Sequence, residues 1–403
     1  MQLASLLKLL LLSLAAAGAA HAQSDKPIRV GVMSDMAGMT SEIVGPGSVI
    51  AAKMAVEDFG GKIGNRPIEV VSGDHQNKPD TGSTLARRWL DVDGVHMIVD
   101  VPNSSVALAV QEVVKIANKV ILHTAGASPA LTGKSCTPNS IHWSRDSYGL
   151  AQSIGKAVVK SGGDTWFFVT ADYAFGHATE AAVGDVVKKS GGKILGSARH
   201  PTNASDFASF LLQAQASNAK VIGMANAGAD TIMAVKQAAE FGITKKQRLV
   251  ASYINISEIH ALGLKAAQGA QLVDTAYWDL NDDMRQWSRR FFERHKKMPT
   301  SLQADVYSAV THYLKAVKAG ADPNDGVAVV KKMKAITVDG PVLRKATIRE
   351  DGRVVRDYYL FRVKTPEESK TPWDYYKLEA TVPGEQLVVP LSASECPLVR
   401  KPT

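Results

Sequence analysis

Short apolar runs alternate with amphipathic stretches through the first third of the chain. The apolar runs are rich in β-branched residues and begin at Ile28, Ile68, His96 and Lys119. The stretches between them have apolar positions at helical spacing and cover residues 48–59, 82–91 and 105–117. Because continuous apolar runs predict buried strands and helical spacing predicts helices, this part predicts a parallel sheet with helices on both faces.

The pattern pauses at residues 137–149, "TPNSIHWSRDSYG", and then restarts as a second series. The strands of this series are predicted to begin at Thr165, Lys193, Lys220 and Arg248. Its helices are predicted at residues 176–190, 204–217 and 229–241, with Gly191 and Gly242 as stops. The sequence therefore predicts a second doubly wound α/β half.

The C-terminal part departs from this alternation. A long helical region is predicted at residues 283–319. Antiparallel strands are predicted after it, in "KATIRED", "RDYYLFRV" and "DYYKLEAT", with hairpin-like turns at Asp351-Gly352 and near Pro366-Glu367. No low-complexity linker separates the two halves, so we expect a hinge of strands between them.

The length of 403 residues, with 45% apolar and 21% charged residues, exceeds what one compact core usually holds and indicates two domains. Residues 1–22 combine an early cation, Lys8, with a leucine-rich core and the small-x-small ending Ala20-His21-Ala22. This is typical of a cleaved secretory signal peptide. The alternative, a membrane anchor, needs a longer apolar core of roughly 20 residues. We therefore expect a soluble mature protein outside the cytoplasm.

The chain has a formal net charge of +8, but its Lys and Arg residues are scattered. A protein that binds nucleic acid would normally cluster them with interleaved aromatic residues. We therefore expect a solvated basic surface and no nucleic-acid partner.

Two cysteines, Cys136 and Cys396, are present, with no CxxC and no metal-ligand spacing. In an oxidising compartment such a pair most simply forms a disulfide, which would tie the C-terminal tail to a distant loop. Two buried thiols or a catalytic cysteine are the alternatives.

Motifs for catalysis and cofactor binding are absent. No GxGxxG opens a helix after a strand, and the chain lacks GxxxxGKS/T, HExxH and GxSxG. Asp74 and Asp172 end predicted strands without a visible partner base, and a lone His123 or His142 is more often structural. We therefore expect no catalytic residues, no metal and no cofactor.

The loops that follow the predicted strands are all short and rich in Gly, Ala, Ser and Asn. They read "SDMAGMTSEIVGPGS", "VPNSS", "TAGASPALT", "TADYAFGHA", "ANAGAD" and "SYINIS". Ligands of doubly wound sheets bind at this edge, where small residues let backbone N–H groups approach a carboxylate. Ser104 and Ser105 open one predicted helix, and for them a simple helix cap is the alternative. Tyr173 and Phe175 could equally be ordinary half-buried aromatic residues.

The segments "IRVGVMSDMAG", "GDHQNKPD", "TAGASPALT", "TADYAFG" and "QAAEFGI", in this order after a signal peptide, resemble the periplasmic solute-binding proteins of ABC importers. The resemblance is to the branched-chain-amino-acid-binding type and runs from about Lys26 to Leu360. It implies an α/β type I fold, in which two doubly wound parallel-sheet lobes are joined by a three-strand hinge and close like a flytrap. It also implies a small-molecule ligand, a membrane permease as partner, and a monomer.

On this resemblance the chain divides into four parts. They are the signal peptide (1–22), an N-terminal lobe (26–144 plus 277–352), a C-terminal lobe (145–276 plus 353–385) and a tail (386–403) held by Cys136 and Cys396.

The family's site residues are replaced at several positions. Asn103 stands where the amino-acid binders have a serine, Ala127 where they have a threonine, and Phe175 where they have a tyrosine. The acidic residue that pairs with the ligand's ammonium group falls near Tyr253. Because a buried ammonium without a counter-charge costs several kcal/mol, this pattern disfavours an α-amino acid.

We therefore expect a small organic acid without an ammonium group, either aromatic or a 2-oxo acid. The expected ligand-binding residues are Asn103, Ser104, Ala125, Ala127, Tyr173, Phe175, Asn226, Tyr253, Trp278 and Gln303. Arg145 is a second candidate partner for a carboxylate, with a surface arginine at the hinge as the alternative. Competing hypotheses are a binder of a branched-chain amino acid, an amide or a urea-like ligand, a sensory ligand-binding domain, and a secreted enzyme.

Overall fold

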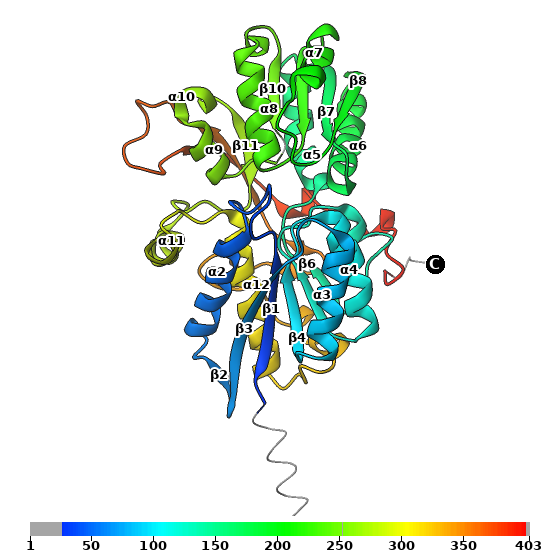
Figure 1. Ribbon diagram of the computed structural model, residues 1–403, viewed down its shortest axis with the longest axis vertical. Helices are drawn as coiled ribbons and strands as arrows, with labels where there is room; N and C mark the ends of the chain where they lie inside the picture. The colour runs from blue at the N-terminus through cyan, green and yellow to red at the C-terminus, as the bar shows by residue number, and fades with distance from the viewer. Residues whose placement is uncertain (1–25, 252, 400–403) are drawn as a thin grey trace, which may run out of the picture.

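The computed structural model describes residues 26–251 and 253–399 and shows two lobes, each built on a parallel sheet (Figure 1). The predicted signal peptide lies outside the described residues. We call the lobe built on strands β1–β6 the N-lobe and the lobe built on strands β7–β10 the C-lobe. The predicted α/β fold class is confirmed.

The N-lobe sheet has the strand order β2-β3-β1-β4-β5-β6, and its neighbours are parallel except for the β2–β3 hairpin. Its strands are β1 (Ile28–Ser34), β2 (Lys62–Ile63), β3 (Arg66–Asp74), β4 (Val95–Asp100), β5 (Val120–His123) and β6 (Ser140–His142). Its helices are α2 (Gly45–Asp58), α3 (Pro79–Asp91), α4 (Ser104–Ile116), α11 (Asp282–His295), α12 (Ser301–Lys318) and α13 (Gly326–Lys334).

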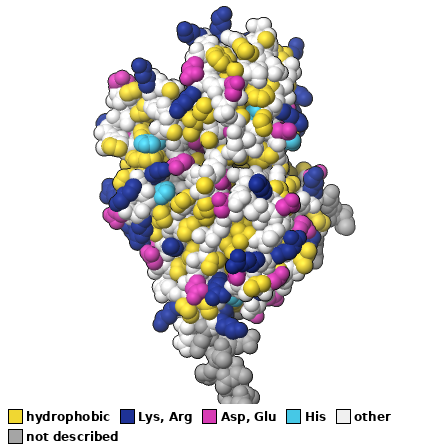
Figure 2. Space-filling model, viewed as in Figure 1, with side chains coloured by type: hydrophobic (Ala, Val, Ile, Leu, Met, Phe, Trp, Pro, Cys, Tyr) yellow, Lys and Arg dark blue, Asp and Glu magenta, His cyan; other side chains and the backbone are white. Residues whose placement is uncertain are grey.

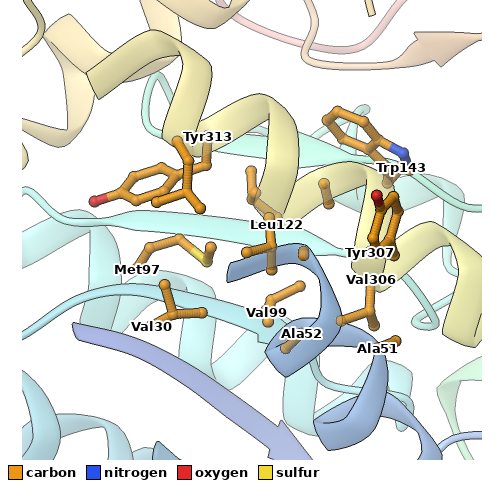
Figure 3. Packing of buried hydrophobic residues seen from close by; sticks show 14 of the residues in the cluster. Val30, Ala51, Ala52, Met97, Val99, Leu122, Trp143, Val306, Tyr307 and Tyr313 are labelled. Atoms are coloured by element: carbon orange, nitrogen blue, oxygen red, sulfur yellow. The ribbon is translucent and has the colours of Figure 1, made fainter. Parts of the chain in front are cut away.

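Each face of this sheet is covered by its own hydrophobic cluster. Side chains of β1, β4 and β5 pack against α2 and α12 on one face (Figure 3). The labelled members of this cluster are Val30, Ala51, Ala52, Met97, Val99, Leu122, Trp143, Val306, Tyr307 and Tyr313. Helices α3 and α4 cover the opposite face. Because both faces of the sheet are buried, the strands are continuous apolar runs and do not alternate apolar with polar residues.

The C-lobe sheet is parallel and has the order β10-β9-β7-β8. Its strands are β7 (Thr165–Ala171), β8 (Lys193–His200), β9 (Val221–Ala225) and β10 (Arg248–Ala251). Its helices are α5 (Ser147–Lys160), α6 (Ala174–Lys189), α7 (Ala208–Ala216), α8 (Ala229–Glu240), α9 (Ile256–Leu262) and α10 (Leu264–Ala267).

A third, antiparallel sheet has the order β11-β14-β15 and lies on the C-lobe side of the hinge. Its strands are β11 (Gln271–Asp274), β14 (Tyr358–Val363) and β15 (Tyr376–Val382). The small hairpin of β12 (Thr347–Ile348) and β13 (Val354–Val355) precedes it. The chain passes between the lobes after β6, after β11 and after β13, so strand ends rather than a tether form the hinge.

The predicted disulfide is confirmed, because Cys136 and Cys396 are bonded across 260 positions of sequence. The tail leaves the C-lobe after β15, where the Gly384 N–H donates to Asp357 Oδ1 (3.0 Å). It then meets the N-lobe, where Arg349 Nη1 donates to the Val389 carbonyl (2.9 Å). The disulfide thus anchors a fourth connection between the lobes.

Several elements differ from the sequence-based expectation, among them helix α5, which begins where the predicted pattern paused. The helical region predicted at 283–319 is two helices, because Lys296 adopts a left-handed conformation and Thr300 opens α12 with a capping box. Strand β6 lies within residues 137–149, where no regular element was predicted, and it is too short to show a hydrophobic periodicity. Helix α13 was not predicted at all.

Candidate functional site

A cavity lies between the two lobes, at the carboxyl ends of their parallel strands. Its free volume is about 10 Å³, so the lobes as arranged here leave little more room than one water molecule needs. The N-lobe supplies Thr40, Ile43, Pro102, Ala125 and Leu302. The C-lobe supplies Tyr173, Phe175, Ala227 and Tyr253. The interlobe position agrees with the expectation that ligands bind at this edge of doubly wound sheets.

The lobes touch each other directly around this cavity. The Tyr253 hydroxyl donates to the Ala125 carbonyl (3.2 Å), and the Ala229 N–H donates to the Met39 carbonyl (3.0 Å). At Gly228, just before Ala229, a Cβ atom would lie 2.1 Å from the Met39 oxygen. Only glycine therefore allows this approach, and the structure represents a closed arrangement of the lobes.

The corner between β4 and α4 brings Pro102 to the cavity through a strained backbone. Asp100 and Val101 both have positive φ values, 89° and 54°. Such conformations cost of order 1–3 kcal/mol each and persist only where the surroundings hold them. Asp100 is held by hydrogen bonds from Ser34 Oγ (2.6 Å) and Thr124 Oγ1 (3.3 Å). Burial raises the pKa of Asp100 to about 6.

Asn103 and the two serines after it shape the start of α4. Asn103 Oδ1 accepts hydrogen bonds from the backbone N–H groups of Ser105 (2.9 Å) and Val106 (3.2 Å), so Asn103 caps the helix. Ser104 Oγ is buried and has no hydrogen-bond partner within the described part of the chain. Ser105 Oγ accepts from the Ala174 N–H of the C-lobe (3.4 Å). This corner therefore caps a helix and contacts the opposite lobe at once.

Three aromatic side chains form the C-lobe wall. The Phe175 ring lies 5.1 Å from the Tyr253 ring, nearly edge to face, and 5.8 Å from the Tyr173 ring. Tyr173 precedes α6 and makes no side-chain capping bond, and the first N–H of α6, that of Ala174, instead donates to Ser105 Oγ of the N-lobe. The turn into α6 is tight, because a Cβ atom at Gly176 would lie 2.0 Å from the Ala171 carbonyl oxygen.

Among the described residues that line the cavity, none has an acidic side chain. Asp35, near Thr40, already accepts from Thr40 Oγ1 (2.7 Å) and Asn77 Nδ2 (2.8 Å). Burial alone would raise the pKa of Asp35, but these hydrogen bonds hold it below its usual value. Glu258 accepts from the Gly228 N–H (2.8 Å), and burial raises its pKa to about 7. Both acids are thus occupied by the protein itself.

Arg145 lies beneath the aromatic wall. Its Cζ atom is 4.5 Å from the centroid of the Tyr253 ring. The guanidinium is fully buried and binds Asp274, Ser301 Oγ and Asn255 Oδ1. The alternative that Arg145 is a surface arginine is wrong, because these partners draw it into the interior. They also occupy most of the donors that a ligand carboxylate would need.

The structure brings part of the predicted site together. Ala125, Tyr173, Phe175 and Tyr253 line the cavity. Ala127 is buried in the same hydrophobic cluster as three of them. Asn103 and Ser104 lie next to the cavity residue Pro102 without lining it themselves.

Three predicted residues make other contacts instead. Asn226 Oδ1 accepts from Thr231 Oγ1 (2.9 Å), Trp278 Nε1 donates to the Trp373 carbonyl (2.8 Å), and Gln303 Nε2 donates to the Val44 carbonyl (3.0 Å). None of the three lines the cavity.

Sequence reasoning missed five cavity residues. They are Thr40, Ile43, Pro102, Ala227 and Leu302. The first four lie inside loops that the sequence did place at this edge, so the sequence predicted the correct loops but not these residues within them. Leu302 gave no signal, because it lies inside the predicted continuous helix.

A family model described as periplasmic binding protein matches residues 27–370. The chain belongs to this family. Its members are extracytoplasmic proteins that bind small molecules for transport and are not enzymes. Among the residues that the structure describes, no helix is long and apolar enough to cross a membrane.

Solved structures of similar proteins agree with this assignment. A periplasmic binding protein from Burkholderia mallei is 48% identical, with a TM-score of 0.91 over 93% of this chain and 99% of that chain. A branched-chain amino acid ABC transporter ligand-binding protein from Burkholderia xenovorans is 38% identical, with a TM-score of 0.81 over 93% and 100%. A solute-binding protein from R. palustris in complex with benzoate shares the fold at 18% identity, with a TM-score of 0.81 over 92% and 100%. No curated protein matches the chain.

Proposed function

We propose that this periplasmic ligand-binding protein of an ABC transporter binds a small organic acid without an ammonium group, either an aromatic or a 2-oxo carboxylate. The observation that carries the proposal is the composition of the cavity wall, which has three aromatic rings on its C-lobe side and no acidic side chain among its described residues. The ligand is then delivered unchanged to a permease in the inner membrane, and the binding protein acts as a monomer.

The absence of an acid from the wall argues against an α-amino acid. An ammonium group buried in this cavity would lose its hydration without gaining a counter-charge, which costs several kcal/mol. Asp35 and Glu258 are poor substitutes, because hydrogen bonds from the protein already occupy them. A ligand without an ammonium group avoids this cost.

The remaining features suit a flat ligand with a carboxylate. Phe175 and Tyr253 offer ring faces and edges, and such aromatic pairs contribute about 0.5–1.5 kcal/mol beyond burial. The start of α6 offers backbone N–H groups at the positive end of a helix dipole, where a carboxylate is stabilised. The Tyr173 and Tyr253 hydroxyls add neutral polar groups.

Structures with this fold have been solved with aromatic acids. The R. palustris proteins were crystallised with benzoate and, in another case, with 4-hydroxybenzoate. A branched-chain amino acid is the second candidate ligand, because the 38% identical B. xenovorans protein is named for that transporter class. A leucine-binding protein from Thermotoga maritima also has this fold.

Thermal shift of ligand-stripped protein tests the proposal. A ligand at 100 times its Kd stabilises the folded protein by about 2.7 kcal/mol, which gives a clear shift. We expect shifts with benzoate, 4-hydroxybenzoate or 2-oxo acids and none with L-leucine or L-valine. A shift with the amino acids alone would refute the ligand class, and chemical conversion of any bound compound would refute a binding-only role.

A further inference from the structure

Arg145 occupies the first crossing between the lobes and contacts both of them. On the C-lobe side its Nη1 pairs with Asp274, the last residue of β11. Its Nη2 donates to the Oδ1 atom of Asn255, the residue that precedes α9 (2.7 Å). On the N-lobe side its Nη1 donates to Ser301 Oγ, on the first residue of α12 (2.5 Å). One guanidinium is thus held by two lobes that separate when the protein opens.

The same guanidinium also supports the cavity wall. It packs against the face of the Tyr253 ring at 4.5 Å, a cation–π distance. The other end of that ring reaches across the cleft, where its hydroxyl donates to the Ala125 carbonyl. The contact with Arg145 therefore sets the orientation of a side chain that lines the cavity and bridges the lobes.

Charge balance keeps Arg145 from acting as a free ligand for an anion. Asp274 neutralises it, and the neighbouring Arg356 pairs with Asp305 in the same buried region. Arg356 Nη2 also donates to the Thr275 carbonyl at the second crossing (2.9 Å). This arrangement fits a structural link better than a direct contact with the carboxylate.

We propose that Arg145 is a positioning residue that couples closure of the lobes to the orientation of Tyr253 in the ligand site. The contact that depends on closure is the one with Ser301, because Ser301 is the N-lobe group that the guanidinium binds. When the lobes separate, Ser301 moves away from Asn255 and Asp274, and Tyr253 loses part of its support. The inference rests on the interlobe cavity being the ligand site and holds for either ligand class.

The decisive variant is Ser301→Ala, which removes the cross-lobe hydrogen bond and leaves every charge in place. Ser308→Ala is the matched control, since Ser308 is a buried serine on the same helix with no side-chain hydrogen bond to this cluster. Arg145→Lys is a second test. It keeps the positive charge near Asp274 but lacks the planar group that binds three partners and stacks on a ring.

Calorimetric titrations with benzoate and with L-leucine measure affinity, and thermal unfolding of the ligand-free variants measures stability. We expect Ser301→Ala to weaken binding of whichever probe binds by about 10-fold, the effect of one hydrogen bond to a charged group. Its unfolding temperature should stay close to that of Ser308→Ala. Arg145→Lys should weaken binding at least as much.

Hydrogen exchange of ligand-free protein gives a readout that needs no ligand. In Ser301→Ala, but not in Ser308→Ala, amides of residues 253–262 should exchange faster. Binding of L-leucine alone would refute the proposed ligand class while leaving this test intact. If Ser301→Ala binds its probe with wild-type affinity, the coupling role of Arg145 is overturned. If neither probe binds, unchanged hydrogen exchange in Ser301→Ala would overturn it. A fall in unfolding temperature without loss of affinity would also overturn it.

Discussion

Replacement of Phe175 by leucine isolates the contribution of an aromatic ring to the ligand site. Phe175 is buried, lines the cavity and lies between the rings of Tyr173 and Tyr253. Leucine retains an apolar side chain of similar size, so the fold should lose less than about 1.5 kcal/mol. What leucine cannot replace is the ring edge and face.

The expected loss of affinity follows from the aromatic contact. An aromatic pair contributes about 0.5–1.5 kcal/mol beyond area burial, and each 1.4 kcal/mol changes Kd by a factor of ten. The Kd for benzoate should therefore rise by about 2-fold to 12-fold in Phe175→Leu. An aliphatic 2-oxo acid such as 4-methyl-2-oxopentanoate has no ring to contact, so its Kd should change by less than about 2-fold on the same reasoning.

Isothermal titration of both ligands into both proteins measures this difference. Phe168→Leu is the matched control, because Phe168 is buried in the same hydrophobic cluster but does not line the cavity. It should lower stability by a similar amount and leave the ratio of the two affinities unchanged. Equal weakening of both ligands by Phe175→Leu would refute the claim that this wall recognises an aromatic ring.

Three further outcomes are expected. Asn103→Asp keeps the oxygen that caps α4, so the unfolding temperature should be preserved. Its negative charge should weaken carboxylate binding about 10-fold through repulsion. If calorimetric titration gives an unchanged Kd for the carboxylate, Asn103 is a helix cap only. Burial lowers the pKa of His123 to about 3, so the stability that it contributes is present above the unfolded pKa of 6.5 and is lost as the pH falls. By pH 5 this loss is about 2 kcal/mol, and urea unfolding of His123→Asn should show a shallower decline between pH 7 and 5. Cys136→Ser should cost about 2–5 kcal/mol in urea unfolding without reductant, and labelling of Cys396 in unreduced wild type would contradict the disulfide.

The sequence predicted the strands of both lobes well, because burial on two faces leaves a simple local signal. The runs at Ile28 and Thr165 begin where β1 and β7 begin. That the interlobe cavity lies at the carboxyl ends of the strands followed from topology alone. The aromatic wall followed too, since Tyr173 and Tyr253 lie in loops directly after strands.

Other features depend on contacts between distant parts of the chain. Arg145 lies in a polar stretch that resembles a surface loop, and its burial is caused by Asp274 and Ser301, which are 129 and 156 positions away. Leu302 lines the cavity because α12 begins there, and that break was hidden inside an apparently continuous helical pattern. No local pattern could have shown that Gln303 is used as a cap rather than for a ligand.

One pair of compounds tests the central claim most directly. Phenylpyruvate and L-phenylalanine share a side chain and a carboxylate and differ in having a 2-oxo or a 2-ammonium group. Titration of each into ligand-stripped protein should show phenylpyruvate binding at least about 100-fold more tightly, because the ammonium group finds no free acid in the cavity. Tighter binding of L-phenylalanine would contradict the account.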